Sequence, residues 1–262
     1  MKIIIDPTST TDPYDNVTEI TADSEDANFP IENTRDDFTT NLWKAASGVT
    51  VATITLVVSK GSAVEVLNTN ATSVTVTVGT GGDYDPETGF EPETGFEFES
   101  GVAVTTVYSL PGTGGRLWAD YTEITYPHII TIQLTAAATV CAGIVRAGNV
   151  EEFNDPMYNF GEDSLDYSIE RELNNGADYF RKRNVVRQFD NLQMIETRAN
   201  CFTFKHSIFD YVGPKPLAIR LVHNKITDDE FILFAKRTDS PKITFDCGAS
   251  KGRLRFGLRE VI

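Results

Sequence analysis

The chain has 262 residues, with 38 acidic and 23 basic side chains and a formal net charge of -15. This charge argues against a protein that coats nucleic acid or docks on anionic lipid, because both tasks need clustered cations. Hydrophobic residues make up 40% of the chain, which is enough to fill a core. At this length we expect two domains or one large all-β domain.

The charge is divided unevenly along the chain. Residues 1–145 contain five basic and 20 acidic side chains, so residues 146–262 hold the remaining 18 basic and 18 acidic ones. The first half therefore carries the whole imbalance, which indicates two units with different surroundings.

The N-terminus lacks the apolar run of about 7–15 residues that a signal peptide needs. Other apolar stretches are shorter than the roughly 20 residues that span a bilayer. We therefore expect a protein without membrane insertion that is made in the cytoplasm. The 3 cysteines have no C-x-x-C spacing, and we expect reduced, buried thiols.

The first half alternates between β-branched and polar residues in short runs bounded by Gly, Asn and Pro. This pattern is typical of an antiparallel sandwich. The predicted strands are Val51–Val58, Ala63–Leu67, Ser73–Val78, Val102–Tyr108 and His128–Leu134.

An acidic insertion, residues 79–100, interrupts these strands. It contains a tandem repeat of Pro-Glu-Thr-Gly-Phe-Glu at residues 86–97, and residues 83–99 hold seven acids and no cation. Asp83, Asp85 and Glu87 have the alternate spacing of calcium ligands, but the glycine and closing glutamate of an EF-hand loop do not line up. We expect a solvated acidic tip and no cofactor.

A change of composition near residues 143–156 predicts a boundary between a first domain, 1–150, and a second domain, 151–262. The sequence of the second domain also predicts mainly strands. They are Ser164–Glu172, a two-strand stretch Tyr179–Met194, Leu217–Val222, Glu230–Lys236, Ile243–Cys247 and the tail Gly252–Ile262. The segment Glu196–Tyr211 fits one helix, which the following Gly and Pro would end.

The motifs of common enzymes are missing. The 3 histidines are not spaced for zinc, and the sequence has no G-x-S-x-G, H-E-x-x-H or phosphate-binding glycine loop. The glycine-rich run 111–116 is expected to be a turn. We expect a protein that is not an enzyme.

Residues 17–148 resemble discoidin-like (F5/8 type C) jelly rolls. The matching positions are Pro30, Glu32, Asn33, Asp36, Asp37, Thr40 and Trp43, followed by strands at 52–58, 63–70, 128–134 and 140–148. The resemblance implies a β-sandwich in which Trp43 fills the core. The sequence departs from the family in lacking a glycine after the first strand and in its acidic insertion.

Residues 150–262 resemble distal-tail and tail-tip proteins of tailed bacteriophages. The resemblance rests on Asp166-Tyr167-Ser168, Glu172, Gly176, the strand 178–183, Val212-Gly213-x-Lys215-Pro216 and the terminal strand ending at Ile262. It implies a virion structural protein, synthesised in the host cytoplasm. Such a protein forms a homo-oligomeric ring and joins the tail tube to hub, fibre or receptor-binding components.

Two hypotheses follow from these patterns. For ring assembly, the expected interface residues are Arg181, Lys182, Arg183, Arg253, Arg255 and Arg259. The alternative is a carbohydrate-binding module that contacts host glycan through loop aromatics, for which the candidates are Tyr84, Phe90, Phe96, Trp118 and Tyr121.

Overall fold

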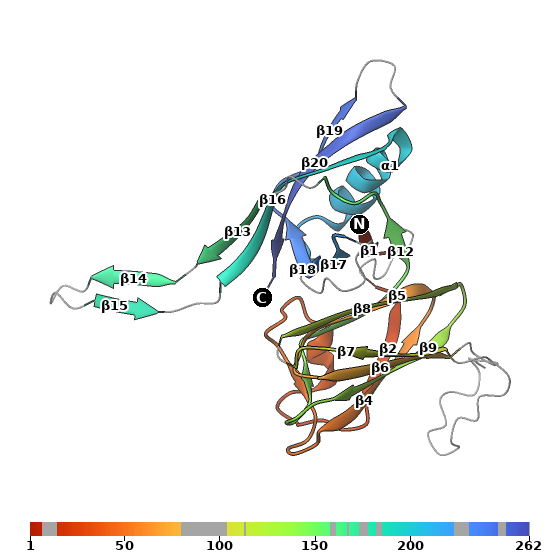
Figure 1. The fold of residues 1–262 in the computed structure, drawn as a ribbon, viewed down its shortest axis with the longest axis vertical. Helices are drawn as coiled ribbons and strands as arrows, with labels where there is room; N and C mark the ends of the chain where they lie inside the picture. Colours follow the sequence, from red (N-terminus) through yellow and green to blue (C-terminus); the bar gives the residue numbers. More distant parts are fainter. Residues whose placement is uncertain are drawn as a thin grey trace. The chain divides into compact units, whose positions relative to one another are not determined.

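A computed structural model describes residues 1–6, 15–79, 104–112, 114–157, 161–166, 168–172, 178–181, 185–222, 231–245 and 250–261. It divides into an N-terminal unit, Ile4–Glu151, and a C-terminal unit, Met1–Ile3 with Glu152–Ile262. The chain therefore begins in the C-terminal unit, forms the N-terminal unit, and then returns (Figure 1). Both units are built mainly from antiparallel strands, as the sequence predicts.

The N-terminal unit is a β-sandwich. Its larger sheet has five strands in the order β2-β4-β9-β6-β7, and a second sheet has the order β11-β5-β8. A short pair, β3 (Trp43–Lys44) with β10 (Cys141–Ala142), and a 3-10 turn η1 (Ile31–Arg35) complete it. The strands of the two sheets are β2 (Val17–Ala22), β4 (Val51–Val58), β5 (Gly61–Thr69), β6 (Ser73–Gly79), β7 (Val104–Ser109), β8 (Gly115–Ile124), β9 (His128–Thr135) and β11 (Ile144–Gly148).

Strict alternation in β4 and β6 explains this packing. In β4, Ala52, Ile54, Leu56 and Val58 are buried and the intervening threonines and valines are not, because successive side chains of a strand point to opposite faces. The buried face joins a core that also contains the fully buried Trp43. The expectation that Trp43 plugs the sandwich is confirmed.

Strand β8 was missed by the sequence analysis, which placed its residues in turns and loops. It runs for 10 residues and pairs antiparallel with β5. Its burial is continuous from Leu117 to Ala119, so the alternation that would reveal a strand is absent. A short stretch covered on both faces is not distinguishable from other apolar runs by its period, and the exposed residues Asp120, Thr122 and Glu123 follow it in β8.

A buried guanidinium anchors the segment after η1. Arg146 on β11 donates to the carbonyl oxygens of Thr34, Arg35 and Asp36 at 3.1, 2.8 and 2.9 Å. Its Nε lies 3.6 Å from a carboxylate oxygen of Asp15. Because Arg146 is only 5% exposed, these partners replace the water that the charge loses on folding.

The C-terminal unit is built on a sheet of eight strands. Its order is β12-β1-β17-β18-β20-β16-β13, with β19 also paired to β20. The strands are β1 (Lys2–Ile4), β12 (Val150–Glu152), β13 (Gly161–Asp166), β16 (Val185–Thr197), β17 (Leu217–Arg220), β18 (Ile232–Arg237), β19 (Lys242–Phe245) and β20 (Lys251–Glu260).

One helical segment covers one face of this sheet. It consists of α1 (Arg198–Phe202) and the π-helical η2 (Thr203–Asp210), close to the predicted Glu196–Tyr211. Phe204 and Phe209 of η2 pack on Phe256 of β20 with ring centroids 4.8 and 6.0 Å away. This aromatic cluster occupies the helix side of β20.

The predicted strand Ser164–Glu172 is divided in the structure. Its first part is β13, paired with β16, and its second part is β14 (Ile169–Glu172), paired with β15 (Asp178–Arg181). Figure 1 shows this second hairpin beyond the ends of β13 and β16. The two hairpins form an arm of the C-terminal unit, and β13 is the last strand of its sheet.

Candidate functional site

The face of β20 opposite the helix is rich in cations. Leu254, Phe256 and Leu258 are buried, whereas Arg253 and Arg255 are exposed and Arg259 is half-buried. This is the period of two that the terminal tail predicts. The structure thus brings three of the expected interface residues onto one sheet face.

Neighbouring strands add cations to the same face. Directly opposed residues of paired strands share a face, and Lys242 of β19 opposes Arg255 while Lys236 of β18 opposes Arg259. Lys251 lies on the same side of β20 because it is two residues before Arg253. We define the cationic face as Lys236, Lys242, Lys251, Arg253, Arg255 and Arg259.

Cross-strand pairs of like charge destabilise a sheet. In the described part of the chain, Lys242 and Arg253 take part in neither an ion pair nor a side-chain hydrogen bond, and Arg255 bonds to the neutral Asn191. An acidic partner would relieve this repulsion, so the face is suited to bind negative charge.

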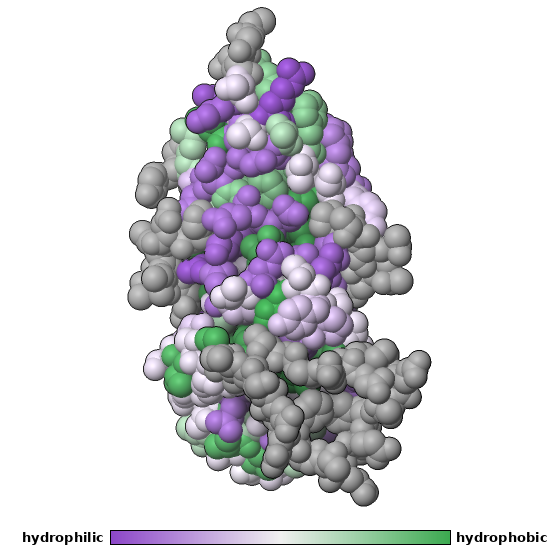
Figure 2. Space-filling model, turned by 90° about the vertical axis from the view of Figure 1, so that its right-hand side faces the viewer, coloured by the Kyte–Doolittle hydropathy of each residue, from purple (hydrophilic) through white to green (hydrophobic). Residues whose placement is uncertain are grey.

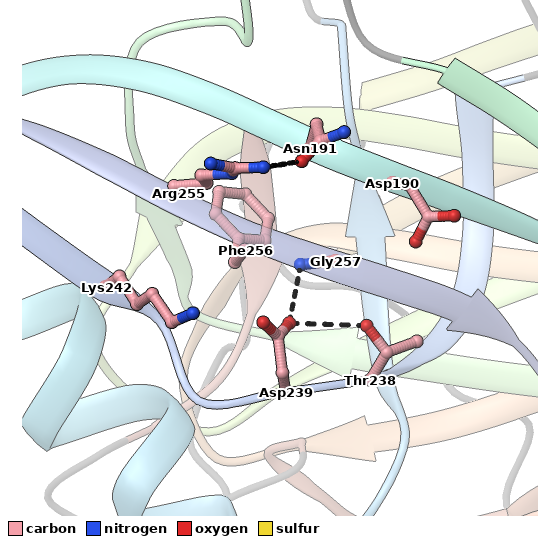
Figure 3. A pocket seen from close by; sticks show the side chains of 8 residues that line it. All are labelled: Asp190, Asn191, Thr238, Asp239, Lys242, Arg255, Phe256 and Gly257. Atoms are coloured by element: carbon pink, nitrogen blue, oxygen red, sulfur yellow. Dashed lines mark hydrogen bonds between the residues drawn. The ribbon is translucent and has the colours of Figure 1, made fainter.

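A pocket of about 320 Å³ opens beside Arg255, where β16 bulges between Phe189 and Leu192 (Figure 3). Asn191 in the bulge has φ of 57° and accepts from Arg255 Nε at 3.0 Å. On the other wall, the Asp239 carboxylate accepts from the backbone N–H of Gly257 at 3.2 Å and from the Thr238 hydroxyl at 3.3 Å.

Figure 3 shows carboxylates and cations lining the pocket together. An added Cβ at Gly257 would lie 2.3 Å from Thr238 Oγ1, so a larger residue there would displace the hydroxyl of this wall. The mixed charges favour a polar occupant over an apolar one. The lining residues are Asp190, Asn191, Thr238, Asp239, Lys242, Arg255, Phe256 and Gly257.

Of the second group of expected interface residues, the structure describes Arg181 alone, and it lies on the arm. Arg181 is the last residue of β15, and Lys182 and Arg183 lie outside the described residues. At the base of the arm, Arg187 Nε of β16 forms an ion pair with Glu162 of β13 at 2.7 Å. Of the two groups, the one on β20 is placed by the structure on a described surface.

The aromatic candidates of the N-terminal unit are placed differently from expectation. Trp118 and Tyr121 lie within β8 and not on loops. Trp118 is 5% exposed and donates its indole N–H to Asp120 at 2.9 Å. A ring this buried offers no stacking platform for a sugar.

Tyr121 is held from inside the unit. Its hydroxyl lies 3.1 Å from His128 Nε2, and His128 Nδ1 donates to the Tyr126 carbonyl oxygen at 3.0 Å. Burial raises the pKa of Tyr121 above its usual value, and burial also lowers the pKa of His128. The His128 imidazole is therefore neutral, and its Nε2 accepts the hydrogen bond that the Tyr121 hydroxyl donates.

A second pocket, of about 580 Å³, opens over the end of β8. Tyr126 lines it and is 47% exposed, and the acidic residues Asp120 and Glu123 also line it. Tyr126 is not among the candidates predicted from the sequence, because a tyrosine before a proline carries no binding signal of its own. The lining residues are Val78, Val104, Asp120, Tyr121, Thr122, Glu123, Ile124, Thr125 and Tyr126.

The remaining candidates from the sequence lie outside the described residues. These are the aromatic residues Tyr84, Phe90 and Phe96 and the acids Asp83, Asp85 and Glu87. Among the residues that are described, no group of three His, Cys, Asp or Glu side chains is arranged to hold a metal ion. Within the same ranges, no helix is both long and apolar enough to cross a bilayer.

Figure 2 shows one side of the molecule coloured by hydropathy. The surface of the C-terminal unit on this side is mostly hydrophilic, with smaller hydrophobic areas between. A surface of this kind favours polar contacts over a large apolar interface.

Comparison with known proteins found no matching family model and no matching curated relative. Among solved structures, reduced XRCC1, crystallised bound to the DNA polymerase beta catalytic domain, matches 52% of this chain and 99% of its own, with 13% identity and a TM-score of 0.38. Chitosan-binding module 1 of a chitosanase/glucanase from Paenibacillus sp. IK-5 matches 53% of this chain and 97% of its own, with 19% identity and a TM-score of 0.38. Similarity at this level defines no function for the chain.

Proposed function

We propose that this protein is a non-enzymatic structural subunit of a bacteriophage tail tip or distal tail. In this role, copies of the chain assemble into a ring, with the cationic face of the C-terminal unit as one contact surface, and connect the tail tube to hub, fibre or receptor-binding components. The tail assignment comes from the resemblance of residues 150–262. The structural support is the cationic face, a sheet surface that carries repelling charges and lies opposite a helix-covered face.

Ring formation requires two different surfaces on each subunit, because a head-to-tail contact joins one patch to another. The C-terminal unit offers the cationic face and, separately, the open edge of β13. This edge strand is exposed along most of its length and carries Glu162, Asp163 and Asp166. Exposed edges can pair with further chains, so the unit has more than one surface for neighbours.

The test is the mass of the purified protein, measured by light scattering over a range of concentrations, with electron microscopy of the particles. We expect a discrete ring that is lost when Arg253, Arg255 and Arg259 are all changed to Glu. The matched control changes Arg198, Lys205 and Lys215 to Glu. These residues lie on the helical segment or just after it, and the change in net charge is the same as in the first variant. A wild-type protein that stays monomeric at every concentration would rule out the proposed function.

A second candidate is carbohydrate binding by the N-terminal unit, and the pocket beside Tyr126 supports it. Sugar sites commonly combine an aromatic face with hydrogen-bonding groups, and Tyr126, Asp120 and Glu123 supply both here. The two roles are compatible if the tail binds a host glycan.

A glycan array tests this candidate. We expect binding that is lost in Tyr126→Ala and retained in Tyr211→Ala, since Tyr211 is a similarly exposed tyrosine of the other unit. Retention of binding in Tyr126→Ala would exclude this pocket. Trp118→Ala is not a suitable probe, because removal of a buried ring tests folding.

A further inference from the structure

The tandem repeat has no role in the sites described above, although it holds the highest density of acids in the chain. We propose that residues 83–99 of one copy dock on the cationic face of a second copy. The proposal rests on the proposed function, because it names the contact that joins neighbouring subunits.

Charge complementarity is the first argument. Residues 83–99 contain seven acids and no cation, whereas the cationic face gathers six cations from three adjacent strands. Two of these cations, Lys242 and Arg255, oppose each other directly. An acidic chain laid across β19 and β20 would neutralise both at once.

Apolar character is the second argument. The repeat places one phenylalanine in each copy, Phe90 and Phe96, beside its acids. On the cationic face, Ile195 opposes Arg253 and is 42% exposed. Aromatic rings also pack favourably on exposed guanidinium groups, so the acid–aromatic pattern fits a face of arginines with an exposed isoleucine.

Reach is the third argument. The segment between Gly79 and Val104 leaves β6 and re-enters at β7, and Val78 opposes Val104 in that pair. Its two ends are therefore close together, and its tip extends at most half of the segment length. At about 3.4 Å per residue, a segment of this length can span at most about 40 Å from its two ends, a distance comparable to the size of a domain.

The experiment uses two complementary variants of the full chain. In the first, Arg253→Glu and Arg255→Glu alter the face and leave the segment intact. In the second, every acid of residues 83–99 becomes the corresponding amide, and the face is intact. Unchanged circular dichroism and thermal unfolding establish that both variants fold.

We expect each variant alone to be monomeric by analytical ultracentrifugation. Mixed, they should form a 1:1 dimer and nothing larger, because only one intact segment and one intact face remain in the pair. A labelled peptide of residues 83–99 should bind the second variant, and its affinity should fall by about tenfold or more when salt is raised from low to high concentration.

The outcomes separate the docking contact from the proposed function. If both variants still form rings, the rings use another surface and the docking proposal is wrong. If removing the acids of residues 83–99 changes the protein in the same way at every protein concentration, the segment docks on the face of its own copy, and the proposal is also wrong. A wild-type protein that never associates overturns the proposed function itself.

Discussion

Asn191 accepts a hydrogen bond from Arg255 Nε at 3.0 Å, from the bulge of β16 to the neighbouring strand β20. The bulge inserts one extra residue into β16, and Asn191 within it has φ of 57°, in the left-handed region. The amide oxygen thereby holds the guanidinium on the cationic face without neutralising its charge. A local backbone irregularity thus positions a residue of the proposed interface.

The left-handed conformation of Asn191 predicts a difference between two substitutions. Asn191→Gly and Asn191→Ala both lose the contact with Arg255, but only glycine adopts positive φ without strain. We expect the free energy of unfolding of the alanine variant to be about 1–2 kcal/mol lower than that of the glycine variant. Urea denaturation measures it, and equal stabilities would show that the bulge relaxes.

The buried guanidinium of Arg146 predicts a large loss of stability on truncation. Arg146→Met removes the donor to four carbonyl groups and leaves Asp15 without this cation. We expect a loss of about 3–5 kcal/mol in the free energy of unfolding.

The matched control for Arg146 is Arg187→Met. It breaks a 2.7 Å ion pair whose side chains are 21% and 43% exposed, so the loss should stay below about 1 kcal/mol. Chemical denaturation of both variants provides the comparison. Similar losses in the two would contradict the role assigned to burial.

Gly143 predicts a steric effect. A Cβ there would lie 2.3 Å from the carbonyl oxygen of Thr39, and backbone cannot move aside as a flexible side chain can. Gly143→Ala should therefore lower the free energy of unfolding by about 1–3 kcal/mol. Gly161→Ala is the control, since no atom lies within 4 Å of its added Cβ, and thermal unfolding of the two variants should differ clearly.

The contacts of His128 predict a dependence of stability on pH. Burial lowers its pKa in the folded protein, so the unfolded chain binds a proton more readily. The stabilisation is complete above the unfolded value near 6.5 and decreases as pH falls below it towards the folded pKa. Urea denaturation at pH 7.5 and 5.5 should show a larger decrease for wild type than for His128→Gln. An equal decrease would assign the effect to the carboxylates that both proteins share.

Local pattern was enough for the elements with clean periodicity. The alternation of Val51–Val58 predicted β4 with its exact bounds, and the alternating tail predicted the basic face of β20. In both strands one face is buried and the other is at least partly exposed, so the alternation of hydrophobic residues follows the alternation of burial. The helix was also predictable, because Gly213 and Pro214 follow it and stop its continuation.

The first half of β8 gave no such signal, because Leu117, Trp118 and Ala119 are buried in succession. Continuous burial hid β8, and this error led to Trp118 being expected on a loop. The pocket at Tyr126 and the pocket at the β16 bulge were equally unpredictable, since each is lined by residues from strands or turns separated along the chain. The spacing of residues along one sequence does not show which residues from distant strands line the same pocket.

The sequence by itself determined the all-β class, the concentration of negative charge in the first half and the basic face of the last strand. These properties depend on the composition of the chain and on the alternation of neighbouring residues, and both can be read without knowing which distant segments pair. Only the tertiary structure decided that Lys236 and Lys242 join the arginines of β20, that Trp118 is buried and that Asn191 holds Arg255. Strand order and register set those relationships, because antiparallel pairing brings distant residues onto one face.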